Sequence, residues 1–321
     1  MLLGKESVRK STRRLVEKVG LGRMCNALLF GALCLSALSA CGDIDPAFSP
    51  GYFWMWNGRL DVPTLISQLD DMHAHGLRSV CIHPFPTNFR RGIFESHMEP
   101  DYLTSEYLDV FAKVVKRARE LGMDAWLYDE GGWPSGGACG LVASGDAEGR
   151  FRRRRLSIGA DGKPTLVVEP YSGNPPYPSM IEKGAVDSFL SLTHDAYAKA
   201  IPDDIGKTVR FAFTDEPAMP RACDGSRTSV GWTADFDEVF RAKKGYDLRP
   251  HIKELLERKD DTDDRLAKLR IDYHEVRADL FMERYQLPIR DWCRAHGMIA
   301  GGHLNGEDVP ERIAEYGHGD L

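Results

Sequence analysis

The sequence lacks the patterns of several common classes of protein. Its 321 residues contain no CxxC pair and no cysteine spacing typical of a metal site. No repeat with a period of about 20 to 50 residues is visible, which excludes a solenoid or a propeller. The net charge is −6, so the chain has no excess of positive charge with which to bind the phosphates of nucleic acid.

The first 40 residues differ from the rest of the chain. They hold seven Lys or Arg and two Glu, then the apolar run ALLFGALCLSAL and, at residues 38–41, LSAC. A basic start, a short apolar core and small residues before a cysteine are typical of a bacterial export signal. The run is shorter than the about 20 apolar residues of a membrane-spanning helix.

LSAC resembles a lipobox. We therefore predict a lipoprotein signal peptide over residues 1–40, lipidation of Cys41 and a linker over 41–50. The expected location is the periplasm or the outer membrane of a Gram-negative bacterium. An ordinary secretory signal or a different start codon is the alternative.

The cysteines beyond this segment have no predicted partners. Export would permit disulfides, but Cys81 lies in an apolar strand-like run, where a buried free thiol is at least as consistent with the sequence. The four are Cys81, Cys139, Cys223 and Cys293.

Apolar strands alternate with amphipathic helices from about residue 50 onward. This alternation predicts βαβ units and a parallel sheet. The predicted strands lie at 52–56, 77–86, 123–132, 208–217 and 297–308. The predicted helices lie at 61–76, 105–122 (with Ser105 as the cap), 184–201 and 235–295, the last interrupted by a charged turn at 258–265.

Residues 150–180 break this alternation. The sequence GADGKP at 159–164 lies between two strand-like runs and predicts a small β insertion after the third strand, followed by a proline-rich connection. The run RRRR at 152–155 predicts a solvated strand edge, with a basic binding patch as the alternative.

The order of these elements favours a (β/α)8 TIM barrel. A doubly wound sheet would carry a glycine-rich phosphate loop after its first strand, and WMWNGRLD is not one. Because about five of the eight strands can be counted, we predict a partial barrel, an incomplete catalytic domain over residues 51–321 and a fragment of a longer protein.

Polar and aromatic residues occur at each predicted strand end. In a barrel these ends converge on the active site. Carboxyl groups there can cleave a glycosidic bond, and indole rings can stack on a sugar. Asp129 and Glu130 are expected to bind hydroxyls or a metal, and Trp133 to form a platform. The candidates are Trp54, Trp56, Asn57, His83, Asp129, Glu130, Trp133, Asp215, Glu216, His303, Asn305 and Glu307.

Simpler roles stay open for several candidates. Trp54 and Trp56 are equally consistent with core packing, and His83 with a structural histidine before Pro84. Because neighbours on a strand point to opposite faces, Asp215 has the alternative role of capping the following loop while Glu216 acts in the site.

Four motifs together resemble glycoside hydrolase family 106, whose characterised members are α-L-rhamnosidases. They are YDEGGWPSGG at 128–137, FTDEP at 213–217, IHPFPT at 82–87 and WCRAHGMIAGGHLNGE at 292–307. The resemblance runs from about Tyr52 to the C-terminus, although the insertion after the third strand is short for the family. It implies a (β/α)8 catalytic domain, inversion at the anomeric carbon, a calcium ion near the substrate and accessory β domains further along.

The resemblance also implies roles for single residues. Glu216 takes the general-acid position. Glu307 takes an active-site carboxylate position, with contacts to calcium or sugar hydroxyls and a possible role as base. The family's general base is expected on the next strand, beyond residue 321.

The predicted function is therefore an inverting glycoside hydrolase that cleaves α-L-rhamnosyl linkages. The alternatives are a retaining glycosidase of another sugar specificity and a non-catalytic glycan-binding lipoprotein. Expected partners are an oligosaccharide or polysaccharide and the membrane through Cys41, with Ca²⁺ as a possible cofactor. Neither nucleic acid nor an obligate protein partner is expected.

Overall fold

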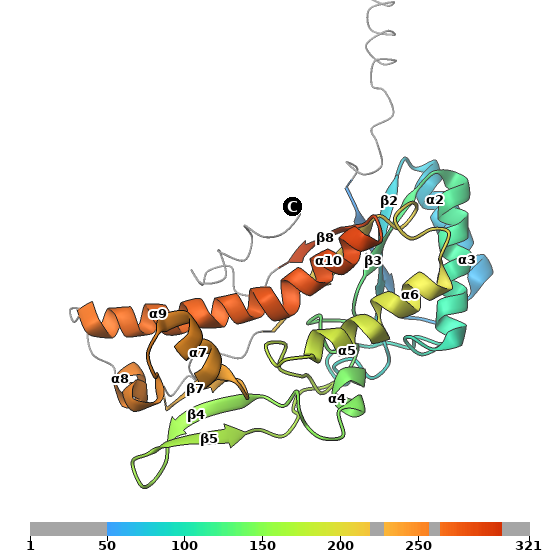
Figure 1. The fold of residues 1–321 in the computed structure, drawn as a ribbon. Helices are drawn as coiled ribbons and strands as arrows, with labels where there is room; N and C mark the ends of the chain where they lie inside the picture. The colour runs from blue at the N-terminus through green and yellow to red at the C-terminus, as the bar shows by residue number, and fades with distance from the viewer. Residues whose placement is uncertain (1–49, 219–227, 257–263, 304–321) are drawn as a thin grey trace, which may run out of the picture. The chain divides into compact units, whose positions relative to one another are not determined.

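Five parallel strands form the main sheet. The computed structural model describes residues 50–218, 228–256 and 264–303. The strands are β1 (Tyr52–Trp56), β2 (Ser79–Pro84), β3 (Asp124–Tyr128), β6 (Phe211–Asp215) and β8 (Ile299–His303). Figure 1 labels β2, β3 and β8. Each pairs in parallel with the next, in the order β1-β2-β3-β6-β8. The five predicted strands and the parallel sheet are confirmed.

The strand order favours one of the two expected architectures. Strands that follow one another in the chain are also neighbours in the sheet, whereas a doubly wound sheet reverses its strand order at a switch point. A barrel has the sequential order seen here. Within the described residues β1 and β8 are the outer strands, so closure into a barrel stays a prediction.

Helices lie between the strands along the chain. They are α2 (Val62–Ala74), α3 (Ser105–Leu121), α4 (Leu141–Gly145), α5 (Ala185–Leu192), α6 (His194–Ala200), α7 (Phe236–Lys244), the 3-10 helix η2 (Arg249–His251), α8 (Ile252–Leu256), α9 (Asp264–Phe281), the π-helix η3 (Met282–Gln286) and α10 (Leu287–Ala295).

The helix ends follow the local sequence closely. Asp61 caps α2 by accepting a hydrogen bond from the Thr64 amide at 3.1 Å. Thr104, and not the predicted Ser105, caps α3, which ends at Gly122 in the left-handed conformation. The predicted helix over 184–201 is two helices, α5 and α6, which meet at Thr193.

A second sheet contains the predicted insertion. Strands β4 (Arg154–Ile158) and β5 (Pro164–Val168) form an antiparallel hairpin, and β7 (Ser229–Trp232) pairs with the other side of β4. The sequence did not predict β7. The prediction that residues 152–155 form a solvated strand edge is wrong for Arg154 and Arg155. Both lie in β4, which is the middle strand of this sheet.

The tryptophans of β1 face the helices. Trp56 is 1% exposed, and its ring lies 6.1 Å from that of Tyr107 and 6.3 Å from that of Phe111, both on α3. Trp54 is also buried and donates a hydrogen bond from Nε1 to Gln68 on α2. Their expected role as sugar-binding residues is wrong, since they form part of the core between sheet and helices.

The alternate residues of β1 face the other side of the sheet. Phe53 and Met55 are 54% and 45% exposed, as the period of two along a strand requires when Trp54 and Trp56 are buried. Asn57 follows the strand and is exposed. It does not line the cavity described below, so the structure does not support its expected role in binding substrate.

Two further features concern the described residues alone. Cys81, Cys139 and Cys293 are buried and form no disulfide, while Cys223 lies outside the described residues. No helix in the described part of the chain is both long and apolar enough to cross a bilayer.

The two faces of β1 predict different responses to truncation. Trp56→Ala should lower the free energy of unfolding by about 3–5 kcal/mol, because it leaves a cavity in the core. Phe53→Ala should change it by roughly 0.5 kcal/mol or less, because the ring is already half exposed. Urea denaturation followed by circular dichroism measures both, and equal losses would contradict this assignment of the faces.

Candidate active site at the strand ends

A cavity of about 420 Å³ lies at the carboxyl ends of the parallel strands. Its walls are mainly aromatic and apolar, and three polar side chains share one part of the lining. The lining residues are Phe53, Met55, His83, Trp133, Phe213, Asp215, Glu216 and His303. The structure thus brings together five of the predicted site residues: His83, Trp133, Asp215, Glu216 and His303.

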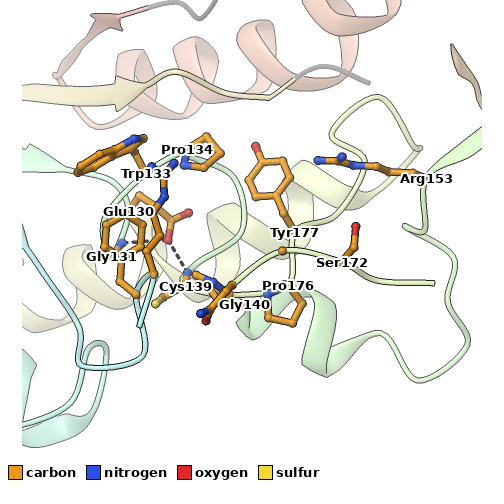
Figure 2. A pocket seen from close by; sticks show the side chains of 15 residues that line it. Glu130, Gly131, Trp133, Pro134, Cys139, Gly140, Arg153, Ser172, Pro176 and Tyr177 are labelled. Carbon is orange, nitrogen blue, oxygen red and sulfur yellow. Dashed lines mark hydrogen bonds between the residues drawn. The ribbon is translucent and has the colours of Figure 1, made fainter. Parts of the chain in front are cut away.

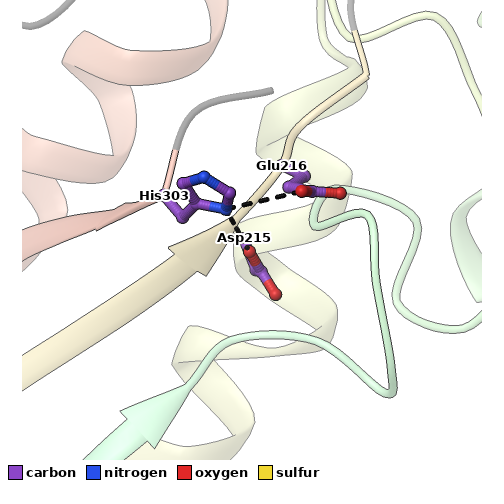
Figure 3. A group of neighbouring side chains, drawn as sticks. All are labelled: Asp215, Glu216 and His303. Atoms are coloured by element: carbon purple, nitrogen blue, oxygen red, sulfur yellow. Dashed lines mark ion pairs between the residues drawn. The ribbon is translucent and has the colours of Figure 1, made fainter. Parts of the chain in front are cut away.

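The three polar residues lie beside one another at the ends of β6 and β8 (Figure 3). Asp215 and His303 are direct partners in the parallel register. The Nδ1 atom of His303 lies 3.4 Å from Oδ1 of Asp215 and 3.4 Å from Oε1 of Glu216. The Glu216 side chain is 35% exposed, so a ligand in the cavity can reach it.

The backbone turns Glu216 toward the same cavity as Asp215. Strand β6 ends at Asp215, and Glu216 has a φ of +47°, in the left-handed region that costs an ordinary residue about 1–2 kcal/mol. Its amide donates a hydrogen bond to the His303 carbonyl at 2.7 Å. Asp215 and Glu216 were expected to point to opposite faces of the sheet. They do not, because Glu216 lies beyond the end of the strand.

Glycine at position 302 permits this close approach. A Cβ atom at Gly302 would lie 1.8 Å from the Thr214 carbonyl oxygen, and its φ is +146°. Strands β6 and β8 meet closely at this point, which brings His303 beside the two carboxylates.

Three hydrogen bonds, with Tyr128 and Ser135, hold Asp215 in place. The Tyr128 hydroxyl donates a hydrogen bond to Oδ2 at 2.6 Å. Ser135 holds the backbone: its Oγ accepts from the Asp215 amide at 2.7 Å, and its amide donates to the Asp215 carbonyl at 2.8 Å. Asp215 therefore has a defined orientation, with Tyr128 and Ser135 as its positioning residues.

Ser135 comes from a loop that is built around Glu130. The Glu130 carboxylate is 2% exposed and accepts hydrogen bonds from five backbone amides of the loop that follows it. The donors are Gly131, Gly136, Gly137, Ala138 and Cys139. Burial raises the pKa of Glu130 to about 7, although the hydrogen bonds from the Gly131, Cys139, Gly137 and Ala138 amides act to lower it.

Glycine is required at one of these donors. Gly136 has a φ of +118°, and a Cβ there would lie 2.7 Å from the sulfur of Met180. Glycine therefore allows the backbone of this loop to wrap around the Glu130 carboxylate.

Asp129 is buried behind the cavity. It is fully buried and accepts a hydrogen bond from the Ser135 hydroxyl at 2.5 Å. Burial raises the pKa of Asp129 well above its usual range. Neither Asp129 nor Glu130 lines the cavity with Asp215 and Glu216. The structure therefore does not support their expected role in binding hydroxyls or a metal in this cavity, and both instead support the loop.

His83 and Trp133 lie where the sequence predicts. The His83 ring stacks on that of Tyr128, with centroids 3.6 Å apart. Burial lowers the pKa of His83 to about 3, so its imidazole is neutral at physiological pH. Its Nε2 is buried without a hydrogen-bond partner among the described residues, and the ring lines the cavity. A ligand hydroxyl is a suitable partner for this nitrogen.

Sequence reasoning missed several residues of the site. Phe53, Met55 and Phe213 line the cavity, while Tyr128 and Ser135 position Asp215. The period of two in YFWMW contains the signal for Phe53 and Met55, but all five residues are apolar, so the pattern does not say which face meets the cavity.

Three predicted site residues lie outside the described residues: Cys41, Asn305 and Glu307. Among the described ones, ligand atoms of Asp215, Glu216 and His303 lie within 4.8 Å of one another. Calcium takes six to eight oxygen ligands, whereas this set includes an imidazole nitrogen, which suits transition metals better. This group does not fit the calcium ion that the family resemblance implies.

Comparison with known proteins finds similarity in structure alone. Neither a family model nor a curated protein matches the chain. The chain is similar to the solved structure of a rhamnosidase from Novosphingobium sp. PP1Y, with a TM-score of 0.55 and 11% sequence identity. The match covers 82% of this chain and 46% of that chain. At this identity the likeness shows a rhamnosidase-like α/β fold, over about half the length of that neighbour.

The role of Glu130 predicts a large effect of an isosteric substitution. Glu130→Gln should lower the free energy of unfolding by about 2–3 kcal/mol, because its NH2 group replaces one carboxylate oxygen and cannot accept hydrogen bonds from the buried N–H donors on that side. Glu95→Gln is the matched control, since the Glu95 side chain is 87% exposed. Urea denaturation measures both variants, and a loss below about 0.5 kcal/mol for Glu130→Gln would show that the loop does not depend on this carboxylate.

Proposed function

We propose that this chain belongs to a glycoside hydrolase that acts on α-L-rhamnosyl linkages, in the manner of glycoside hydrolase family 106. The observation that carries the proposal is the group Asp215, Glu216 and His303 in an aromatic-lined cavity at the carboxyl ends of sequentially ordered parallel strands. The structural likeness to a rhamnosidase supports the choice of sugar.

The cavity lining suits a deoxy sugar. Apolar C–H faces and the methyl group of a rhamnosyl unit can pack against Phe53, Phe213 and Trp133. Hydroxyl groups can bond to Asp215, to His303 and to the unpaired Nε2 of His83. A cavity with few polar groups in a mainly apolar wall is typical of a specific small-ligand site.

Glu216 is the proposed general acid. It is the more exposed of the two carboxylates, whereas Asp215 is held by Tyr128 and Ser135. In this role Glu216 gives its proton to the glycosidic oxygen as the bond to the anomeric carbon breaks. Asp215 and His303 then orient the sugar and set the charge around Glu216.

Asp215 is too close to Glu216 to act as the base of an inverting pair. Ligand oxygens of the two residues lie within 4.8 Å of each other, whereas inversion requires about 6.5–9.5 Å to admit the attacking water. An inverting mechanism therefore takes its base from a residue outside the described ones, and Glu307 is a candidate. Calcium binding, export and lipidation of Cys41 also stay proposals.

The leaving group tests the role of Glu216. Glu216→Gln should slow the hydrolysis of a rhamnosyl disaccharide by about 10²–10⁴-fold, because the sugar leaving oxygen needs a proton. The same variant should retain much more of its activity on 4-nitrophenyl α-L-rhamnopyranoside, whose weakly basic phenolate leaves without protonation. Initial rates on both substrates give the comparison, with Glu95→Gln as the control.

Two outcomes would contradict the proposal. Equal losses on the two substrates would show that Glu216 is not the general acid. Binding of rhamnosides by the unmodified chain without any hydrolysis would favour a glycan-binding role instead.

A further inference from the structure

A second cavity, of about 230 Å³, lies beside the candidate active site. Figure 2 shows it between the loop that follows Glu130 and the segment that contains Ser172, Pro176 and Tyr177. Trp133 lines both cavities. The volume is below the about 300–1,000 Å³ of a typical ligand pocket, so the second cavity suits a single small unit of a longer ligand.

Arg153 enters this cavity from the insertion. Its guanidinium carbon lies 5.8 Å from the centre of the Tyr177 ring, and its Nε is buried without a hydrogen-bond partner among the described residues. The next two arginines differ: Arg154 pairs with Glu182 at 2.9 Å and Arg155 with Glu169 at 2.8 Å. Arg153 thus differs from Arg154 and Arg155 as a cation whose charge is not matched by a described carboxylate.

A second guanidinium lines the same cavity. Arg90 lies over the Trp133 ring at 4.7 Å and over the Phe89 ring at 5.2 Å, and its amide donates a hydrogen bond to the Asn174 carbonyl at 3.1 Å. Contacts with the two rings hold the guanidinium in place, and no ion pair to a described residue neutralises it.

The one carboxylate in the lining has no free oxygen with which to bind a ligand or the guanidiniums. Glu130 also borders the cavity, but both of its oxygens are occupied by the five backbone amides of its own loop. The groups that remain for a ligand are two guanidiniums, the hydroxyl of Ser172, the side chain of Asn174, and aromatic and proline surface.

We infer that this second cavity is a subsite for a saccharide unit that bears a carboxylate, that is, a uronic acid next to the unit bound at Glu216. A guanidinium fork matches a planar carboxylate and forms strong charge-assisted hydrogen bonds with it. The sugar ring packs against Trp133 and the prolines. The inference rests on the proposed function for the identity of the neighbouring unit, but the binding of an acidic sugar can be measured without hydrolysis.

The test is a titration of the full chain with D-glucuronate, D-glucose or acetate. Saturation-transfer NMR measures the binding of each. Glucuronate should bind at least about tenfold more tightly than glucose, which lacks the charge. Acetate, which has the charge without the ring, should bind more weakly than glucuronate.

Variants locate the site. Arg153→Gln should weaken glucuronate binding by roughly tenfold or more, whereas Arg153→Lys, which keeps the charge, should weaken it less. Arg152→Gln is the matched control: it removes the same charge from the adjacent residue, which does not line the cavity. Circular dichroism of each variant establishes that it is folded.

Three results would overturn the inference: equal binding of glucuronate and glucose, equal binding of acetate and glucuronate, or equal effects of Arg153→Gln and Arg152→Gln. Failure of the proposed function has a different signature, because it would appear in the hydrolysis of rhamnosides by the Glu216 variant and leave uronate binding unchanged.

Discussion

The buried carboxylate of Glu130 is the interaction on which the candidate site depends. Five backbone amides converge on its two oxygens, so one side chain determines the path of the loop up to Cys139. A buried carboxylate is costly unless it is fully hydrogen-bonded, and buried amide groups are costly without acceptors. The amides donate the hydrogen bonds that the carboxylate needs, and the carboxylate accepts from amides that need acceptors. The loop is therefore rigid, although a glycine-rich sequence would by itself be mobile.

The rigid loop determines the geometry of both cavities. It presents Trp133 to the two cavities, and it places Ser135 where its hydroxyl and amide hold the backbone of Asp215. Asp129 holds the same serine by accepting a hydrogen bond from its hydroxyl. The proposed acid, Glu216, follows Asp215 directly. Because the loop holds the backbone of Asp215 at the end of β6, it also determines where Glu216 lies. A residue outside the reacting groups thus sets their relative positions.

The sequence was sufficient for the five strands of the main sheet and for much of the candidate site. Strand-end position identified Asp215, Glu216, His303, His83 and Trp133, because parallel strands bring their carboxyl ends together. It failed for Trp54 and Trp56, since β1 is apolar on both faces and periodicity cannot select one. It failed for Asp129 and Glu130 for another reason: a carboxylate beside a glycine-rich loop is equally consistent with binding a ligand and with binding the loop's own amides. Only the backbone path decides between these roles.

The most direct test of this account is backbone amide hydrogen exchange, measured by NMR on the unmodified chain. The account predicts that the amides of Gly136, Gly137, Ala138 and Cys139 exchange as slowly as those of the central strands β3 and β6, because all four donate to a buried carboxylate. Exchange of these four amides at the rate of an unstructured peptide, with slow exchange in the strands, would contradict it and leave Glu130 available for the ligand-binding role that the sequence first indicated.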